Sequence, residues 1–287
     1  MSYHFAQKFF IPKNRPYGCS IFRGLYFGPI KSDFADFGVI RHSSMCSTIV
    51  AIVLIDKNTG DLNKLIYLNC VVFVKIENKW KEIERAYPCC YNGCINTNNR
   101  VGKCIKGNGF LNIINDENIK YLVGGYDRYG SVSAENSFKT PQRCLNYSLY
   151  YFEVKCKIEE DDWEVWMYIG LENCNAYKFI RYYADLAQIK TEKGAFELST
   201  FFNNNDIFGC GLVYPPTNKL NEEFPYVFFT QNGKRIGKGV LVKENFDSYK
   251  PYVFLKCCSI EANFGNNLES NPFNYDISNH SILKEFY

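Results

Sequence analysis

The chain has 287 residues, of which 17% are aromatic and 22% are charged, and its formal net charge is +3. This length fits one large domain, or one domain with an extension. The 24 Phe and 22 Tyr favour β-structure, because aromatic side chains pack well on pleated surfaces. The small net charge excludes a strong basic field, so neither nucleic acid nor an anionic membrane surface is expected as a partner.

Cysteine usage and the N-terminus bear on the cellular compartment. The 13 cysteines cannot all pair within one chain, and several lie in apolar strand patterns, where they read as small buried hydrophobes. A reducing compartment, cytoplasmic or nuclear, is therefore expected. Residues 1–8 lack the charged start and apolar core of a signal peptide. Secretion is the alternative if the true N-terminus carries such a signal.

Residues 1–105 are predicted to form an N-terminal extension of mixed or irregular structure. The apolar, β-branched run Thr48–Ile55 predicts a buried strand and is far shorter than the roughly 20 residues that span a bilayer. From Ile66 to Ile76 apolar residues alternate with others, and the polar residues 77–79 then lead to Trp80–Ile83. This pattern predicts a β-hairpin within residues 65–84.

A group of cysteines follows among Asn and Gly residues, and its spacing bears on metal binding. Zinc sites usually take four thiolate or imidazole ligands arranged as two close pairs. Here the second pair is missing, and the three histidines lie elsewhere in the chain, at His4, His42 and His280. No metal is therefore expected, and the alternative is a zinc site built on Cys90, Cys94 and Cys104.

The clearest strand signal runs from Tyr150 to Ile158, where apolar residues alternate with Lys and Glu. A period of two with charges on one side means that one face is buried and the other solvated. The acidic run Glu159–Asp162 predicts a turn, and Val165–Leu171 repeats the alternation. Gly130–Glu135 is expected to form the preceding strand. Strands with such large apolar faces must be covered by a second sheet.

Six segments resemble, in the same order, the framework motifs of SPRY (B30.2-like) domains. They are Tyr150–Val154, Met167–Leu171, Asn205–Gly211, Phe228–Lys234 with Ile236-Gly237, Tyr249–Val253, and Asn263–Gly265 followed by Pro272-Phe273. The resemblance implies an all-β fold, a bent two-sheet antiparallel β-sandwich of the concanavalin-A-like jelly-roll type. It places the domain at residues 106–277 and leaves residues 278–287 as a C-terminal tail.

The chain departs from the family pattern between Leu171 and Asn205, and Gln231 stands where Lys is usual. The family includes ubiquitin-ligase substrate receptors, scaffolds of the Ran-binding-protein-M type and secreted effectors of plant-parasitic nematodes. The Asn-, Lys- and Tyr-rich composition favours the effectors, and the missing signal peptide disfavours them. The divergent segment between Leu171 and Asn205 is expected to determine which partner the domain binds.

The resemblance implies a non-catalytic module that binds a protein or peptide through interstrand loops, as an adaptor, a ligase substrate receptor or an effector. No enzyme activity, small-molecule cofactor or membrane association is expected. A carbohydrate-binding, lectin-like sandwich is the alternative. Exposed loop aromatics are the best contact candidates, because Tyr offers a large rigid area with a polar tip. The candidate residues are Tyr126, Tyr129, Tyr182, Tyr183, Tyr214 and Pro215.

Overall fold

The computed structural model describes residues 71–83, 110–123, 128–142, 144–159, 164–175, 178–217, 223–244 and 247–283, and the backbone of three strands between residues 34 and 67. Contacts along the chain divide it into two compact units, residues 1–68 and residues 69–287. The two units are described separately below.

Unit 1 contains a three-stranded antiparallel sheet with the order β1-β2-β3. Its strands are β1 (Phe34–Ser44), β2 (Ser47–Asp56) and β3 (Leu62–Tyr67). The central strand β2 contains the β-branched run Thr48–Ile55, so the predicted strand is confirmed. Segments rich in Val and Ile favour the β-strand conformation, because their branched side chains fit a pleated surface.

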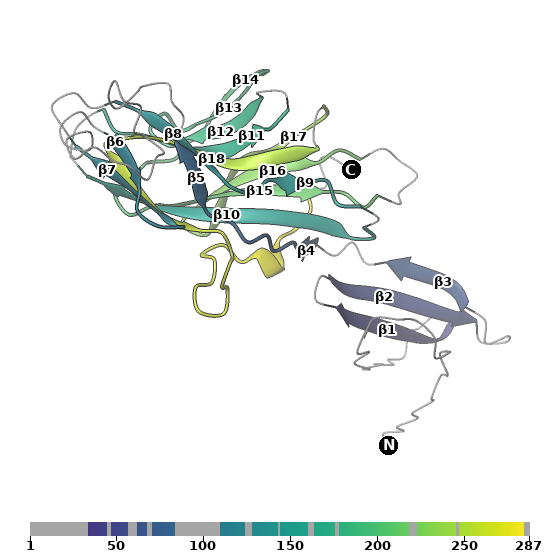
Figure 1. Ribbon diagram of the computed structural model, residues 1–287. Coiled ribbons are helices and arrows are strands. Elements are labelled where there is room, and N and C mark those ends of the chain that lie inside the picture. Colours follow the sequence, from purple (N-terminus) through teal and green to yellow (C-terminus); the bar gives the residue numbers. More distant parts are fainter. Residues whose placement is uncertain are drawn as a thin grey trace. The chain divides into compact units, whose positions relative to one another are not determined.

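Unit 2 is a sandwich of two large sheets, and the predicted all-β fold class is confirmed (Figure 1). Sheet 1 has the order β17-β16-β15-β10-β19-β7-β6, with β4 parallel to β10. Sheet 2 has the order β14-β13-β12-β11-β18-β8-β5, with β9 beside β18. Apart from β4, every pairing is antiparallel.

The strands of sheet 1 are β4 (Val71–Phe73), β6 (Phe110–Ile113), β7 (Asn118–Leu122), β10 (Tyr147–Ile158), β15 (Ile207–Tyr214), β16 (Tyr226–Gln231), β17 (Lys234–Leu241) and β19 (Cys258–Asn263). Those of sheet 2 are β5 (Trp80–Ile83), β8 (Gly130–Ala134), β9 (Phe138–Lys139), β11 (Trp166–Asn173), β12 (Phe179–Tyr183), β13 (Gln188–Thr191), β14 (Gly194–Glu197) and β18 (Ser248–Lys256).

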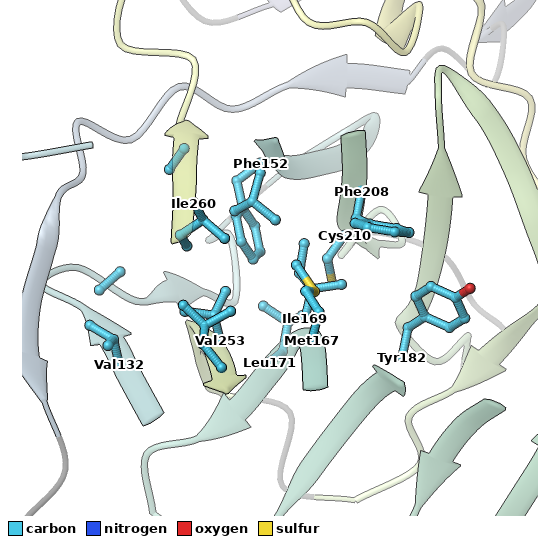
Figure 2. Packing of buried hydrophobic residues seen from close by; sticks show 14 of the residues in the cluster. Val132, Phe152, Met167, Ile169, Leu171, Tyr182, Phe208, Cys210, Val253 and Ile260 are labelled. Carbon is cyan, nitrogen blue, oxygen red and sulfur yellow. The ribbon is translucent and has the colours of Figure 1, made fainter. Parts of the chain in front are cut away.

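The main core lies between the two sheets and is built from alternate residues of the central strands. Phe152 of β10 and Phe208 of β15 face Met167 and Ile169 of β11, and all four side chains are fully buried (Figure 2). Each large apolar side chain removed from water in this way contributes about 1.5–3 kcal/mol. The period-two patterns of β10 and β11 therefore predicted their inward faces correctly.

The opposite face of β10 is covered over part of its length, where the sequence pattern predicted a solvated face. Tyr151 and Glu153 are buried, whereas Lys155 and Lys157 are exposed. A second hydrophobic cluster covers this part of β10. It includes Phe273 and several side chains that follow it in the sequence. A second apolar layer therefore lies outside the sandwich itself.

Hydrogen bonds hold the C-terminal segment, residues 271–283, against sheet 1. The backbone N–H groups of Asn274 and Tyr275 both donate to the Glu153 carboxylate at 2.8 Å. His280 is buried, and its two ring nitrogens lie 2.9 Å from the hydroxyls of Tyr226 and Tyr275. Residues 278–283, predicted as part of a tail, are thus packed against the domain.

The predicted hairpin within residues 65–84 is not formed. Strand β4 joins β10 in sheet 1, and β5 joins β8 in sheet 2, so the connection passes from one sheet to the other. Asn78 fixes this connection, since its side chain accepts from the N–H of Asn136 at 2.9 Å and donates to the C=O of Asn136 at 2.8 Å. Residues 71–83 therefore belong to the sandwich and not to an extension that ends at residue 105.

Candidate functional site

A row of aromatic side chains lies on the outer face of sheet 2. Since Met167 and Ile169 of β11 point into the core, Tyr168 between them points outward. Tyr168 stands directly opposite Tyr183 of β12 and Phe254 of β18. The register of three neighbouring strands therefore places three aromatic residues side by side across the sheet.

The rings of this row are in contact with one another. The Tyr168 ring centroid lies 3.9 Å from that of Tyr183 and 4.8 Å from that of Phe254. Tyr129, just before β8, stacks on Phe254 at 4.7 Å and lies 5.6 Å from Trp166. All five side chains are half-buried. We call Tyr129, Trp166, Tyr168, Tyr183 and Phe254 the aromatic row.

Cationic groups cover several rings on the same face. The Lys190 ammonium lies 4.3 Å from the Tyr183 ring centroid, and the Lys256 ammonium lies 5.1 Å from the Trp166 ring. The Arg181 guanidinium lies 4.0 Å from the Phe179 ring and 4.2 Å from the Tyr252 ring. Such cation–π contacts are worth about 0.5–1 kcal/mol each at exposed sites, so they help to hold both the rings and the cations in place.

Gly170 lets the Arg181 side chain reach across the central strand. Arg181 of β12 and Tyr252 of β18 both stand opposite Gly170, so the guanidinium must pass over this residue to meet the Tyr252 ring. A Cβ atom at position 170 would lie 2.1 Å from the backbone oxygen of Ile180. The close approach of β11 and β12 therefore depends on a glycine here.

Asp185, in the turn after β12, makes the charge of this region sensitive to pH. Burial raises the pKa of its carboxyl group to about 6, although the N–H groups of residues 185 and 186 and the charge of Lys190 act in the opposite direction. Burial and the neighbouring Asp185 carboxylate also raise the pKa of the Tyr168 hydroxyl. The Tyr168 hydroxyl is therefore neutral at physiological pH and can both donate and accept hydrogen bonds.

The predicted contact residues divide into three groups. Tyr129 and Tyr183 both belong to the aromatic row. Tyr182 and Tyr214 are core residues with relative exposures of 0% and 1%, so the prediction that they contact a partner does not fit their positions. The sequence-based expectation places both in interstrand loops, but Tyr182 lies in β12 and points into the core, and Tyr214 ends β15. Pro215 is half-buried beyond β15.

Tyr126 and the cysteines of the alternative zinc site, Cys90, Cys94 and Cys104, lie outside the described residues. Among the residues that are described, no group of three His, Cys, Asp or Glu side chains is placed to hold a metal ion. The described part of the chain also contains no helix that is long and apolar enough to cross a membrane.

Sequence reasoning missed three members of the row, Trp166, Tyr168 and Phe254. The alternation that predicted an inward-facing Met167 also assigns Trp166 and Tyr168 to the other face, so a signal for these two was available in the sequence. Their contacts with Phe254 and Tyr129 depend on strand order, which the local pattern does not contain.

No protein-family model matches the chain, and no curated protein matches its sequence. Among solved structures, a human SPRY domain is 18% identical over 55% of this chain and 97% of its own length, with a TM-score of 0.41. The carbohydrate recognition domain of Emp46p in its metal-free form is 9% identical over 54% of this chain and 82% of its own, with a TM-score of 0.34. Lectin II from Ulex europaeus is 7% identical over 54% and 91%, with a TM-score of 0.31. A SPRY domain, the type that the six sequence motifs resemble, is thus among the similar structures.

Proposed function

We propose that unit 2 is a SPRY-type, non-catalytic interaction module that binds a protein or peptide segment on the aromatic row. The six motif segments support the assignment of the scaffold, because they occur in the family's order along β10, β11, β15, β16–β17, β18 and β19. They are framework segments, so the proposal for the binding surface depends on other residues.

The composition of the row is the observation that carries this proposal. Trp, Tyr and Arg are the residues that dominate binding energy at protein interfaces, and they do so from well-packed, partly desolvated positions. Trp166, Tyr168 and Tyr183 occupy such positions, with Arg181 beside them. Because neighbouring rings already fix their rotamers, these side chains lose little conformational entropy when a partner binds.

The packing of the rings favours a protein partner over a sugar. A sugar ring stacks on the open face of an aromatic ring. Tyr168 has Tyr183 on one side and Phe254 on the other, and Lys190 covers the Tyr183 ring. These contacts leave the ring edges and hydroxyl groups of Tyr168 and Tyr183 as the parts that can meet a partner, and such groups suit apolar and hydrogen-bonding contacts with a polypeptide.

Selection of a random peptide library on the immobilised full chain tests the proposal. We expect selected peptides to bind the double variant Tyr168→Ala/Tyr183→Ala at least about thirtyfold more weakly, which corresponds to the loss of about 2 kcal/mol expected for a hot spot. Ile114→Ala is the matched control, because it removes an exposed apolar side chain from the far end of sheet 1.

If the selected peptides bind the double variant as tightly as the unaltered chain, the aromatic row is not the binding surface. A glycan array provides the second arm of the test. Saturable glycan binding that disappears in the double variant would assign the same row to a lectin-like function.

A further inference from the structure

Strand β14 presents an open edge. It is the last strand of sheet 2, it pairs only with β13 in the described part of the chain, and all four of its residues are exposed. The Leu198 N–H donates to the Ala187 C=O at 2.7 Å. Because backbone groups alternate in direction along an antiparallel strand, Ala195 and Glu197 direct their N–H and C=O groups away from β13. These groups are available to another strand.

The other edge strand on this side of the sandwich, β17, is less suited to such pairing. Its register shifts between Val227 and Phe229 of the partner strand, and Gly237 has a φ of +61°. It also carries three cations, Lys234, Arg235 and Lys238. Irregular and charged edges resist strand addition. On this side, the regular edge of β14 is therefore the one that can accept a strand.

An apolar groove lies between β14 and β17. It has a volume of about 240 Å³, and Phe196, Val240 and Val242 are among its lining residues. Phe196 stands opposite the inward-facing Ile189, so its side chain lies on the groove side of the sheet, yet it is 58% exposed. A side chain on the inner face of an added strand would cover Phe196.

The charged side chains that line the groove indicate which kind of ligand it can bind. Lys178 bridges Glu192 at 3.3 Å and Glu244 at 3.5 Å, and Lys193 reaches Glu244 at 4.0 Å. These pairs neutralise the two lining glutamates. Lys243 also lines the groove and has no acidic partner among the described residues. The lining contains three lysines, Lys178, Lys193 and Lys243, against two glutamates, so the groove carries a net positive charge and is complementary to a negative ligand.

We propose that β14 binds an extended segment of a partner protein whose groove-facing positions, every second residue, carry an apolar residue flanked by acidic residues. The segment pairs with the outward backbone groups of Ala195 and Glu197, as in other cases of β-strand addition. Its apolar side chains cover Phe196, and its carboxylates lie near Lys193 and Lys243. This edge is distinct from the aromatic row on the outer face, so the two surfaces can be tested independently; Figure 1 shows β14, β13, β12 and β11 side by side.

The test uses the full chain and a short fluorescein-labelled peptide in which every second residue is Glu or Val, with Val flanked by Glu at these positions and Thr at the positions between them. Fluorescence anisotropy should show saturable binding that weakens as salt is raised. Ala195→Pro removes one outward N–H, a change that edge strands tolerate, and should weaken binding at least tenfold. Lys193→Glu/Lys243→Glu should do the same. The control Lys75→Glu changes an exposed charge outside the groove and should leave binding unchanged.

Several outcomes would overturn the proposal. Backbone N-methylation of the peptide should abolish binding, and unchanged binding by the methylated peptide excludes strand pairing. Loss of binding in Tyr168→Ala/Tyr183→Ala but not in Ala195→Pro assigns the peptide to the aromatic row. Slow amide exchange at Ala195 and Glu197 in the free monomer shows that the chain covers its own edge. Dimerisation that Ala195→Pro abolishes shows that a second copy occupies it.

Discussion

Gly170 illustrates how a single residue sets the geometry of the outer face of sheet 2. An added Cβ atom would lie 2.1 Å from the Ile180 oxygen and 2.8 Å from the Arg181 Cα. Both are backbone atoms, so the methyl group can fit only if β11 and β12 separate. The separation would also displace the guanidinium of Arg181 from the Tyr252 ring.

We therefore expect Gly170→Ala to destabilise the domain by about 1–3 kcal/mol, the usual cost of adding a methyl group to a closely packed site. Urea unfolding followed by fluorescence measures this change in the free energy of unfolding. Gly130→Ala, in the same sheet, is the matched control, since its Cβ would meet only the end of the Leu111 side chain at 2.9 Å. An equal loss of stability in both variants would refute the role of backbone proximity at Gly170.

At the scale of elements, the C-terminal segment depends on one buried carboxylate. Glu153 of β10 accepts hydrogen bonds from the Tyr151 hydroxyl and from the N–H groups of Asn274 and Tyr275, each at 2.8 Å. The carboxylate can accept all three because it has only acceptor sites. A glutamine at position 153 would place its NH₂ group opposite one of these three donors. That donor would then have no acceptor.

Glu153→Gln should therefore lower the free energy of unfolding by about 1–3 kcal/mol, since a buried polar group loses its partner. It should also make the segment 271–283 more accessible to limited proteolysis, with the cleavage sites read by mass spectrometry. Glu261→Gln on the exposed side of β19 is the control and should change neither quantity. Unaltered proteolysis of the Glu153 variant would show that the apolar contacts alone hold the segment.

At the scale of the whole molecule, two of the described groups, His280 and Asp185, change the stability in opposite directions as the pH falls. Burial lowers the pKa of His280 to about 4 from 6.5, with a smaller contribution from the charge of Arg235. Between these values the unfolded chain binds a proton that the folded chain does not, so stability is lost as pH falls. Burial raises the pKa of Asp185 to about 6 from 3.8, so the folded chain binds its proton first and stability is gained as pH falls.

Stability curves of two variants separate these effects. Relative to the unaltered chain, His280→Asn should lose less stability between about pH 6.5 and pH 4, and Asp185→Asn should lose more between about pH 6 and pH 4. Urea unfolding at intervals across this range measures both. Parallel curves for all three proteins would contradict the assignment of either group.

Short-range patterns in the sequence were sufficient to predict the features that neighbouring residues specify. Alternation predicted the buried faces of β10 and β11, because side chains of a strand alternate between its two sides. The pair Asn232-Gly233 is typical of a two-residue hairpin turn and forms the turn between β16 and β17, where both residues have a positive φ, +50° and +74°. These features belong to neighbouring residues, so no tertiary information was required to find them.

Features that depend on contacts between distant residues could be found only in the folded structure. The hairpin prediction at 65–84 was wrong because β4 and β5 pair with strands of two different sheets. The burial of Glu153 depends on Asn274, which is 121 residues away. The aromatic row and the β14 edge likewise arise from strand order and register. Strand order and register bring together side chains that are far apart in the sequence, and the local sequence around each of them does not predict the contact.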